Sequence, residues 1–366
     1  MMITQEYTSE AVTLLSHLIA TPSISRNEQA AADLMETALR AYGFAPRREA
    51  NNLWAIAPHF DEQHPTVLLN AHIDTVKPVA SWTRDPFAPT REGDTLYGLG
   101  SNDCGGGLVS LLQAFRILSA MPRNYNLIYL ASAEEEVSGQ DGISRALPLL
   151  PPINVAIVGE PTGMQPAVAE KGLMVLDLTA RGKSGHAARN EGVNAIYEAL
   201  DDLLWLRDYR FERVSEFLGP TKMAVTVVNA GTQHNVVPDR LTALIDVRTN
   251  ELYTNEEVFD IVRRHCKSTI TAHSFRLHSS RIPTSHPLIR RCVALGLTPF
   301  GSPTLSDQAL MPFPSFKLGP GESSRSHSAD EFIRVSEIER AIHTYVELLK
   351  GDALQGGCVK SDTFSF

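Results

Sequence analysis

The sequence lacks several features that would assign the chain to a particular class of protein. Its four cysteines (Cys104, Cys266, Cys292 and Cys358) are widely spaced and form no CxxC pair, which excludes a disulfide framework and favours a reducing compartment. The formal net charge of −9 argues against nucleic-acid binding, which needs a basic surface. No apolar run approaches the roughly 18 residues that span a bilayer, and the first residues lack the basic and apolar regions of a signal peptide. We therefore expect a cytoplasmic protein with no nucleic-acid or membrane partner.

The composition is that of a globular protein with more than one domain. Hydrophobic residues make up 43% of the chain and charged residues 20%, as in ordinary soluble domains. A chain of 366 residues exceeds the usual size of one core, so we expect two domains. Amphipathic stripes predict helices ending near Ile19 and Tyr42, and short apolar runs predict the buried strands of an α/β sheet. These runs cover residues 53–57, 66–70, 126–131 and 155–158.

A second pattern of strands and helices follows Lys171-Gly172. In order it reads β-α-β-β-α-β, the arrangement of a small ferredoxin-like layer. The elements are expected at residues 174–181, 194–207, 223–229, 241–248, 255–267 and 274–277. Because the first pattern resumes near Pro283, we expect a large domain of residues 1–172 and 282–350, with residues 173–281 inserted in it. Residues 351–366 have little apolar periodicity, which is typical of a loosely held tail.

Five short segments place potential metal ligands at the ends of hydrophobic runs. The first contains His72 and Asp74, which follow the second run, and sites in open α/β sheets lie beyond the carboxyl ends of the strands. Imidazole with a carboxylate suits zinc, and an Asp near a ligating His commonly orients it. The second contains Asp103, followed by glycines at 105–107 that let the backbone pass close to a neighbour. A carboxylate in such a loop is suited to bridging two ions.

The other three segments supply acidic residues and a second histidine. Glu134, Glu135 and Glu136 follow the third run, and adjacent carboxylates repel one another unless cations offset their charge. One of them is suited to binding a metal ion while its neighbour accepts a proton. Glu160 follows the fourth run, and His327 lies in a polar loop that gives no other reason for a histidine.

Each segment alone has an ordinary explanation. A surface histidine, a helix-capping Asp, a nucleotide-binding glycine turn, a solvated acidic loop or a simple turn would each account for one of them. Residues 105–107 match neither the GxGxxG nor the P-loop pattern. The five together favour a hydrolytic site with two metal ions, because every strand predicted to lead to one face of the sheet ends in a ligand-type residue.

The segments occur in the order and at the spacing of the M20 family of metallopeptidases and deacylases, which the chain resembles over residues 8–350. The resemblance implies that His72 and Glu160 bind one zinc ion and that Glu135 and His327 bind a second. It implies that Asp103 bridges the two ions. Cobalt and manganese also suit such mixed nitrogen and oxygen ligands.

The resemblance also implies a fold and two further roles. Asp74 would orient His72, and Glu134 would be the general base that takes a proton from water and returns it to the leaving amine. The expected fold is α/β, with a large zinc-hydrolase domain whose mixed sheet is flanked by helices. The inserted ferredoxin-like α+β domain would be the dimerisation or lid domain, so a homodimer is expected.

Four further residues resemble substrate-contacting positions of the family. His186 lies in Ser-Gly-His-Ala-Ala and would steady the oxyanion, typically across a dimer. Asn235 and Arg248 would bind substrate, because a guanidinium binds both oxygens of a carboxylate at once. Gly319 lies in the Gly-Pro-Gly loop before His327. The family more commonly continues after this position as Asp-x-Lys-Gly-Gly, whereas this chain has Cys104 directly after Asp103. We expect Cys104 not to bind a metal ion.

The expected reaction is removal of an N-acyl group, acetyl or succinyl, from a small N-acyl amino acid. The first choice is conversion of N-acyl-ornithine to ornithine in arginine biosynthesis. A succinyl-diaminopimelate desuccinylase and a dipeptidase or aminopeptidase remain open, because all three substrates present a carboxylate to Arg248. A succinyl group would need a further cation, for which Arg325, Lys183 and Arg189 are candidates. The other classes considered are a non-catalytic binding protein, a nucleotide-binding α/β protein and a single-metal sensor.

Overall fold

The computed structural model describes residues 2–189 and 191–354. The chain divides into two compact units, each of which is treated by itself. Unit 2 consists of Ala169–Ser280 and Gly301–Leu305, and unit 1 contains the described residues on either side of these segments.

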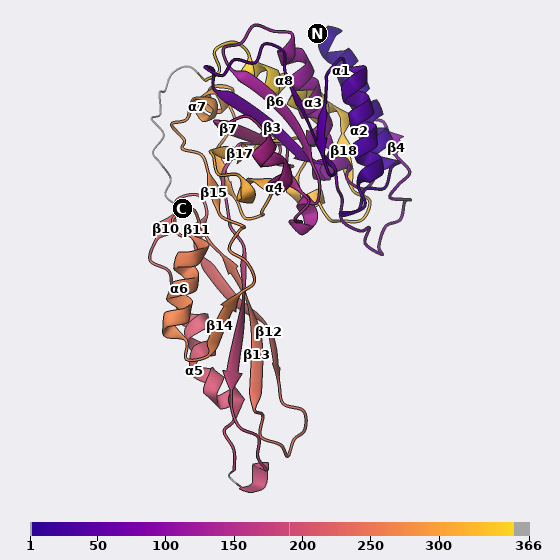
Figure 1. The fold of residues 1–366 in the computed structure, drawn as a ribbon. Coiled ribbons are helices and arrows are strands. Elements are labelled where there is room, and N and C mark those ends of the chain that lie inside the picture. Colours follow the sequence, from indigo (N-terminus) through magenta and orange to yellow (C-terminus); the bar gives the residue numbers. More distant parts are fainter. Residues whose placement is uncertain (1, 190, 355–366) are drawn as a thin grey trace. The chain divides into compact units, whose positions relative to one another are not determined.

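Unit 1 is built on a mixed β-sheet (Figure 1). Its strands run in the order β1-β2-β6-β3-β7-β17-β8-β15, and β16 pairs with β8. The strands that matter for the site are β3 (Thr66–His72), β6 (Asn126–Ser132), β7 (Val155–Val158) and β17 (Ser315–Lys317), which are mutually parallel. The other strands are β1 (Arg47–Glu49), β2 (Asn52–Ile56), β8 (Ala167–Glu170), β15 (Ser280–Arg281) and β16 (Phe300–Ser302). All seven residues of β3 and of β6 are buried, which explains why these strands read as unbroken apolar runs.

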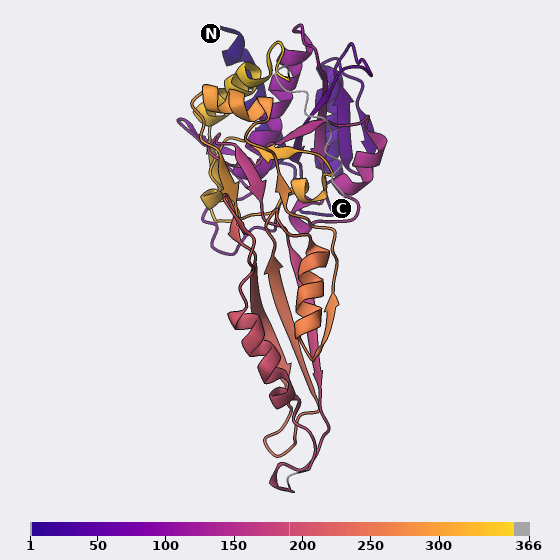
Figure 2. The same cartoon turned by 90° about the vertical axis from the view of Figure 1, so that its left-hand side faces the viewer.

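Helices cover both faces of this sheet (Figure 2). One face carries α1 (Met2–Ile19), α3 (Gly106–Ser119) and α8 (Val335–Leu349), which pack together. The other face buries Trp54, Leu68 and Ile128 against Ile143 of α4 (Ile143–Ala146). The α2 helix (Gln29–Ala41) ends before Gly43, whose φ of 87° suits glycine. The predicted α/β class with a mixed sheet flanked by helices is confirmed for this unit.

The remaining elements of unit 1 are short. The loop that carries Asp103 contains η1 (Ser101–Gly105), in which the backbone of Asp103 and Cys104 is not helical, and the acidic run forms a 3₁₀ turn, η2 (Glu135–Val137). The helix α7 (Pro287–Ala294) and the 3₁₀ turns η3 (Leu147–Leu149), η5 (Asp307–Leu310) and η6 (Ser323–Arg325) complete it. A small separate sheet joins β18 (Phe332–Arg334), β5 (Thr95–Tyr97) and β4 (Thr90–Glu92).

Unit 2 contains a four-stranded antiparallel sheet in the order β12-β13-β9-β14. The strands are β9 (Met174–Arg181), β12 (Lys222–Ala230), β13 (Arg240–Arg248) and β14 (Thr269–Ala272), with a small hairpin of β10 (Val214–Ser215) and β11 (Gly219–Pro220). Helices α5 (Ala195–Asp208) and α6 (Asn255–His265) pack on the four-stranded sheet, and η4 (Ala187–Arg189) is a 3₁₀ turn. Burial alternates along β13, as expected of a sheet covered on one face. Thr254 and Glu257 form a capping box at the start of α6.

Two details differ from the expectations drawn from the sequence. The strand predicted at residues 274–277 is wrong, because the strand that pairs with β9 is Thr269–Ala272. The predicted tail begins at Gly351, but Gly351 forms a bridge with Arg123 and Ala353 is fully buried. The rest of that tail, residues 355–366, lies outside the described residues. Among the described residues, no helix has both the length and the apolar character needed to cross a bilayer.

Candidate metal centre

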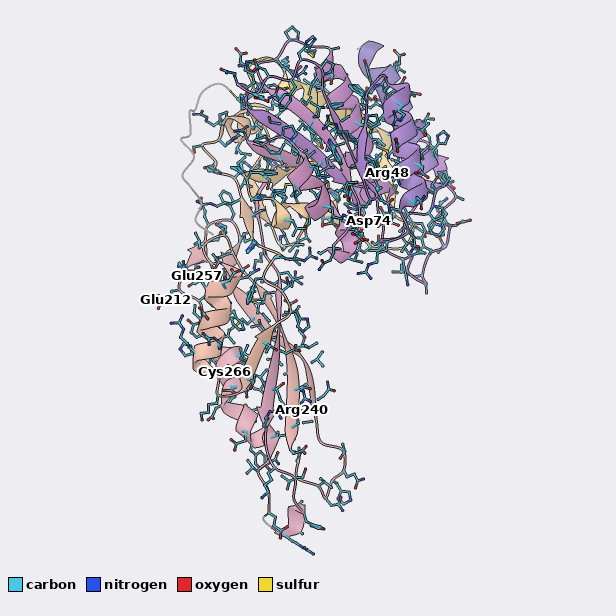
Figure 3. The ribbon with its side chains drawn as sticks, in the orientation of Figure 1. Arg48, Asp74, Glu212, Arg240, Glu257 and Cys266 are labelled. Atoms are coloured by element: carbon cyan, nitrogen blue, oxygen red, sulfur yellow. The ribbon has the colours of Figure 1, made fainter. Side chains whose placement is uncertain are left out.

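The carboxyl ends of the parallel strands of unit 1 lie at one edge of the sheet and gather the predicted ligands. His72 is the last residue of β3, Glu135 begins η2 shortly after β6, and Glu160 follows β7 by two residues. His327 belongs to the loop that follows β17. Asp74 is labelled in Figure 3, just beyond β3. Parallel pairing therefore brings together residues separated by more than two hundred positions in the sequence.

His72 is surrounded by carboxylates. Its Nε2 lies 3.3 Å from Oδ1 of Asp103, 3.6 Å from Oε1 of Glu160 and 3.9 Å from Oε2 of Glu135. Its Nδ1 contacts the backbone carbonyl of Asp74 at 2.9 Å and the Asp74 carboxylate at 3.5 Å. The ring is therefore held by one nitrogen while the other points into the carboxylates, as in many metal-ligating histidines.

His327 approaches the same cluster from the far end of the chain. Its Nε2 lies 2.9 Å from Oε2 of Glu136 and 3.6 Å from Oδ2 of Asp103. The hydrogen bond to Glu136, followed by the nearby acidic charges, raises the pKa of His327 to about 9. Asp103 thus turns one oxygen toward His72 and the other toward His327.

The contacts of the acidic run differ by one residue from the expected arrangement. Glu135 was expected beside His327, but the carboxylate there belongs to Glu136. Glu134, the expected base, has a left-handed backbone (φ 54°), and its Oε2 accepts a hydrogen bond from the Asp141 N–H at 3.3 Å. Its side chain therefore packs toward Gly139 and Asp141, and Glu135 is the acidic residue of the run nearest to His72.

The donor atoms fit divalent cations. Asp103, Glu136 and His327 offer ligand atoms within 4.8 Å of one another, and so do His72, Glu135 and Glu136. Oε1 of Glu160 is buried and has no hydrogen-bond partner in the described part of the chain. Burial, followed by repulsion from Asp103, raises the pKa of Glu160 to about 8. Burial likewise raises the pKa of Glu135, with repulsion from neighbouring carboxylates adding to it. Bound cations would stabilise the ionised forms of Glu160 and Glu135.

Cys104 lies beside these ligands without an evident role. Its Sγ is within 4.8 Å of ligand atoms of His72 and Glu160, and it accepts a hydrogen bond from the His72 N–H at 3.2 Å. Burial raises the pKa of this thiol far above its usual range, and a cation bound beside it would lower that pKa again. The expectation that Cys104 does not bind a metal ion stays a prediction.

Two residues that the sequence analysis did not select bind the Asp103 loop to the His327 loop. Oε1 of the buried Glu331 accepts hydrogen bonds from the N–H groups of Asn102 and Asp103 at 2.8 and 2.9 Å, and Oε2 accepts one from Gly100 at 3.2 Å. The Asn102 side chain donates to the Glu322 carbonyl at 3.1 Å and accepts from the Glu322 N–H at 3.0 Å. The only signal in the sequence was that Glu331 lies four residues after His327.

Gly319 has a packing role. A side chain there would lie 2.4 Å from the Glu160 carbonyl oxygen. Its N–H donates to Oγ1 of Thr162 at 3.1 Å, and its carbonyl accepts from the Met164 N–H at 2.9 Å. These contacts place the loop directly against Glu160. They engage both main-chain polar groups of Gly319, and its expected substrate contact stays a prediction.

The three predicted residues of unit 2 lie in two places. His186 forms a bridge with Val236, and the Asn235 carbonyl accepts from the Ala187 N–H at 3.1 Å, so His186 and Asn235 are neighbours. Arg248 is the last residue of β13, whereas Asn235 precedes the start of this strand, where Figure 3 labels Arg240. At about 3.3 Å per residue, β13 separates the two ends by roughly 26 Å.

Most of the predicted cations are already engaged or lie near His186. Arg248 is paired with Asp246 through Nε at 2.8 Å and Nη2 at 3.1 Å. Arg325 makes two hydrogen bonds with Glu337, at 2.8 and 3.0 Å, which leaves it poorly placed to bind a succinyl group. Lys183 and Arg189 are exposed on the segment around His186.

Comparisons with known proteins identify the family of the chain. Residues 68–351 match the family described as Peptidase family M20/M25/M40. The chain is 28% identical over 363 residues to an acetylornithine deacetylase of Proteus mirabilis, covering 90% of this chain and 93% of the relative. It is 30% identical to an acetylornithine deacetylase of Yersinia pseudotuberculosis, covering 90% and 94%. It is also 28% identical to succinyl-diaminopimelate desuccinylase 2 of a Ruegeria species, covering 72% and 71%.

Solved structures share the fold. A tripeptidase of Staphylococcus aureus aligns with a TM-score of 0.75 at 19% identity, covering 94% of this chain and 98% of its own. The YXEP protein of Bacillus subtilis, described as a dinuclear metal-binding peptidase of the M20 family, aligns with a TM-score of 0.73 at 16% identity, covering 94% and 98%. The chain belongs to peptidase family M20/M25/M40 and is a metal-dependent hydrolase of amide bonds.

Proposed function

We propose that this chain removes the N-acyl group from an N-acyl amino acid, with N-acyl-ornithine as the substrate and ornithine as a product used in arginine biosynthesis. The observation that carries the hydrolytic site is Asp103, whose two oxygens face His72 and His327. A carboxylate in this position suits a bridge between two ions. The choice of substrate is supported by the acetylornithine deacetylases that match nine tenths of the chain.

In this proposal His72 and Glu160 would hold one divalent ion, Glu136 and His327 would hold the other, and Asp103 would contribute to both. Zinc is the first choice, and cobalt or manganese would also suit these nitrogen and oxygen donors. When bound, such ions polarise the amide carbonyl and make water a stronger acid. Asp74 holds the His72 ring by its Nδ1 side, which leaves Nε2 free for the metal.

Glu135 is the proposed general base, in place of Glu134. Its carboxylate lies 3.9 Å from His72 and within the group that includes Glu136, which places it beside the proposed ions. It takes a proton from the attacking water and returns it to the nitrogen of the leaving amine. His186 is proposed to donate a hydrogen bond to the oxyanion.

A turnover assay of the metal-loaded protein tests the function. N-acetylornithine, N-succinylornithine, N-acetylcitrulline, N-succinyl-diaminopimelate and several dipeptides are compared by mass spectrometry. We expect an ornithine derivative to give the highest kcat/KM. A preference for the diaminopimelate compound or for a dipeptide would keep the hydrolytic site and replace the substrate. No turnover of any compound, with two ions bound, would favour a binding protein.

We further propose that the domain of residues 173–281 forms a homodimer with a second copy. Tyr197, Leu200 and Leu204 share one face of α5 and are 70%, 45% and 47% exposed. This helix packs beside β12, which also exposes Val227 and Val228. Within residues 2–189 and 191–354, the outer edge of β12 has no partner strand. Exposed apolar surface next to an open edge is typical of a surface that pairs with another chain.

Sedimentation velocity tests the dimer. The wild type is expected to sediment as a dimer and the double variant Leu200→Glu, Leu204→Glu as a monomer, with unchanged helical circular dichroism. Exchange of the exposed Val293 of α7 in unit 1 for Glu is the matched control and should leave the dimer intact. A wild type that is monomeric at micromolar concentration would remove the proposal.

A further inference from the structure

A buried carboxylate that the proposed reaction does not use lies beside the metal centre of unit 1. Asp307, the first residue of η5, is only 4% exposed. Its Oδ2 accepts a hydrogen bond from Oγ of Ser132, the last residue of β6, at 2.5 Å. The two residues are 175 positions apart in the chain. This bond therefore ties a late segment of unit 1 to the strand that leads to Glu135.

A second buried side chain continues this contact on β3. Nδ2 of Asn70 donates a hydrogen bond to Oγ of Ser132 at 2.9 Å. Asn70 precedes His72 by two residues on β3, so the two side chains lie on the same face of the sheet. Ser132 is the register partner of His72 in the parallel β3–β6 pair. The side chains of Asn70, Ser132 and Asp307, which we call the strand-end network, therefore join the carboxyl ends of β3 and β6 beside His72.

The turn that carries Asp307 is itself held in place. Oγ of Ser306 accepts a hydrogen bond from the Gln308 N–H at 3.3 Å. On the other side, Nε2 of Gln308 donates to Oγ of Ser315, the first residue of β17, at 2.8 Å. Since β17 pairs with β7 in the same sheet, Asp307 reaches Ser132 from a turn that is fixed to the sheet.

The position of Asp307 is unfavourable for a carboxylate. Burial raises the pKa of Asp307 to about 7, although the hydrogen bond from Ser132 and the charge of His72 lower it. Burial, with repulsion from Glu160 and then from Asp307, also raises the pKa of Glu135. An amide at position 307 would avoid both costs. Carboxyl groups perturbed in this way are concentrated at functional sites, which indicates a task beyond packing.

We propose that Asp307 is a positioning residue of the metal centre, which acts through Ser132 to hold the carboxyl ends of β3 and β6 together and thereby fixes His72 relative to Glu135. This inference rests on the proposed function, because it takes His72 as a metal ligand and Glu135 as the base. A carboxylate suits the task, since it accepts a stronger hydrogen bond than an amide does.

The strand-end network should act on one of the two proposed ions. It adjoins His72, which is assigned to the first ion. The second ion is assigned to Glu136 and His327, and the main chain of Glu136 is held by Asp74. Loss of the network is therefore expected to weaken binding of the first ion and to leave the second unchanged.

A double-mutant cycle tests this role. The affinity of the full-length protein for Zn²⁺ is measured by chelator competition, without substrate, in Asp307→Asn, Ser132→Ala and the double variant. Each single exchange should weaken one ion roughly 10- to 100-fold, the range usual for groups that support metal ligands. If Asp307 acts through Ser132, the double variant should lose no more than the weaker-binding single variant. Losses that add would show that the charge of Asp307 acts directly, which overturns the inference.

Two backgrounds that bind a single ion identify which ion is affected. Glu136→Ala is expected to keep the first ion, and His72→Ala is expected to keep the second. Addition of Asp307→Asn should weaken the remaining ion of the Glu136→Ala protein and leave that of the His72→Ala protein unchanged. An equal loss in both backgrounds, or a loss only in the second, would overturn the inference.

Melting temperatures distinguish positioning from a structural role. Asp307→Asn removes a buried charge that repels Glu135, so the metal-free variant should melt no lower than the wild type. Gln308→Ala is the matched control, because it removes a hydrogen bond on the other side of the same turn. It should lower the melting temperature and leave the affinity for Zn²⁺ unchanged. A lower melting temperature of Asp307→Asn with unchanged affinity would reduce Asp307 to a structural role and overturn the inference.

The same titrations separate this inference from the proposed function. They contain no substrate, so a substrate other than N-acyl-ornithine would not affect them. A wild type that binds no more than one Zn²⁺ ion would refute the two-ion site and the inference with it. A wild type that binds two ions, with the same affinities in Asp307→Asn, would refute the inference alone.

Discussion

Oδ1 of Asp74 accepts a hydrogen bond from the main-chain N–H of Glu135 at 3.0 Å. Its Oδ2 accepts from the Glu136 N–H at 3.2 Å and from Oγ of Ser25 at 2.7 Å. Asp74, two residues after the end of β3, therefore fixes the segment that follows β6. Asp74 contacts the His72 ring and also sets the position of Glu135, the proposed base, and of Glu136, a proposed metal ligand.

Exchange of Asp74 for Asn should impair metal binding and turnover together. Asn keeps the size of the side chain, but it replaces one acceptor oxygen by an NH₂ group. This group would face a main-chain N–H, and two donors form no hydrogen bond with each other. We expect a loss of about 10- to 100-fold in metal affinity or activity, as for other groups that support metal ligands. Chelator competition and kcat/KM measure the two effects. Ser25→Ala removes one of the three hydrogen bonds and should cost much less.

The two candidate bases are distinguished by Glu135→Gln and Glu134→Gln. Because Glu135 lies next to the proposed ions, its Gln variant should lose roughly 10²- to 10⁴-fold in kcat while it still binds two ions. Glu134→Gln should retain most activity, since its carboxylate bonds to the Asp141 N–H. Metal content by mass spectrometry accompanies each rate. The opposite ranking of the two variants would return the role to Glu134.

The choice within the acidic run could not be made from the sequence. Residues 134–136 are chemically identical and adjacent, so composition and spacing place a metal ligand there without selecting one. The left-handed conformation of Glu134 turns the chain after β6, and the two hydrogen bonds to Asp74 complete the turn. Those contacts join segments about 60 residues apart in the sequence, which no local pattern encodes.

Removal of Glu136 and removal of His327 should each reduce the number of tightly bound ions from two to one. Glu136→Ala and His327→Ala each remove a ligand of one proposed ion, whereas His72 and Glu160 remain to hold the other. We expect each variant to retain one tightly bound ion and to lose the second. The double variant should be no worse than either single one, because both residues act on the same ion. Retention of two tightly bound ions by Glu136→Ala would contradict its assignment.

The metal-free protein should lose stability as the pH rises. Burial raises the pKa of Glu331 to about 7, and burial with repulsion from Asp103 raises that of Glu160 to about 8. The hydrogen bond to Glu136 raises that of His327 to about 9. Each folded-state pKa lies above its unfolded value, so the folded protein binds more protons. The stability from these groups is present below the unfolded values and is lost as pH rises through the folded ones.

Thermal melts from about pH 4 to about pH 10 test this dependence, because the range spans the unfolded and folded values of the three groups. The melting temperature of the metal-free protein should fall across the range. With two ions bound, cations replace the protons at Glu160 and His327, and the fall should be smaller. A metal-free melting temperature that rises with pH would contradict the assigned burial of these groups.

The framework of the fold was predictable because its strands are buried on both faces. The run at residues 66–70 appears as β3, and that at 126–131 as β6. The strand of residues 269–272 was missed because it is short and lies at the edge of its sheet, and two of its four residues are exposed. Its position depends on pairing with β9. The ion-pair partners of Arg248 and Arg325 could not be predicted either, since an ion pair leaves no periodic signal in the sequence.

Glu331 should act as a positioning residue for Asp103. Its carboxylate accepts hydrogen bonds from Gly100, Asn102 and Asp103, so it shapes the loop that presents the bridging carboxylate. In Glu331→Gln, the amide oxygen is able to accept the bonds of Asn102 and Asp103, but the NH₂ group then faces the Gly100 N–H. One buried donor left without an acceptor costs roughly 1–3 kcal/mol. We expect a lower melting temperature and weaker binding of both ions.

The metal affinity distinguishes positioning from a general loss of stability. It is measured by chelator competition well below the melting temperature, where Glu331→Gln is folded. A purely structural role would lower the melting temperature and leave this affinity at the wild-type value. Asp330→Asn is the matched control, because Asp330 adjoins Glu331 but bonds to Thr83 and Arg84. It should leave the metal affinity unchanged, since its partners lie outside the loop that carries Asp103.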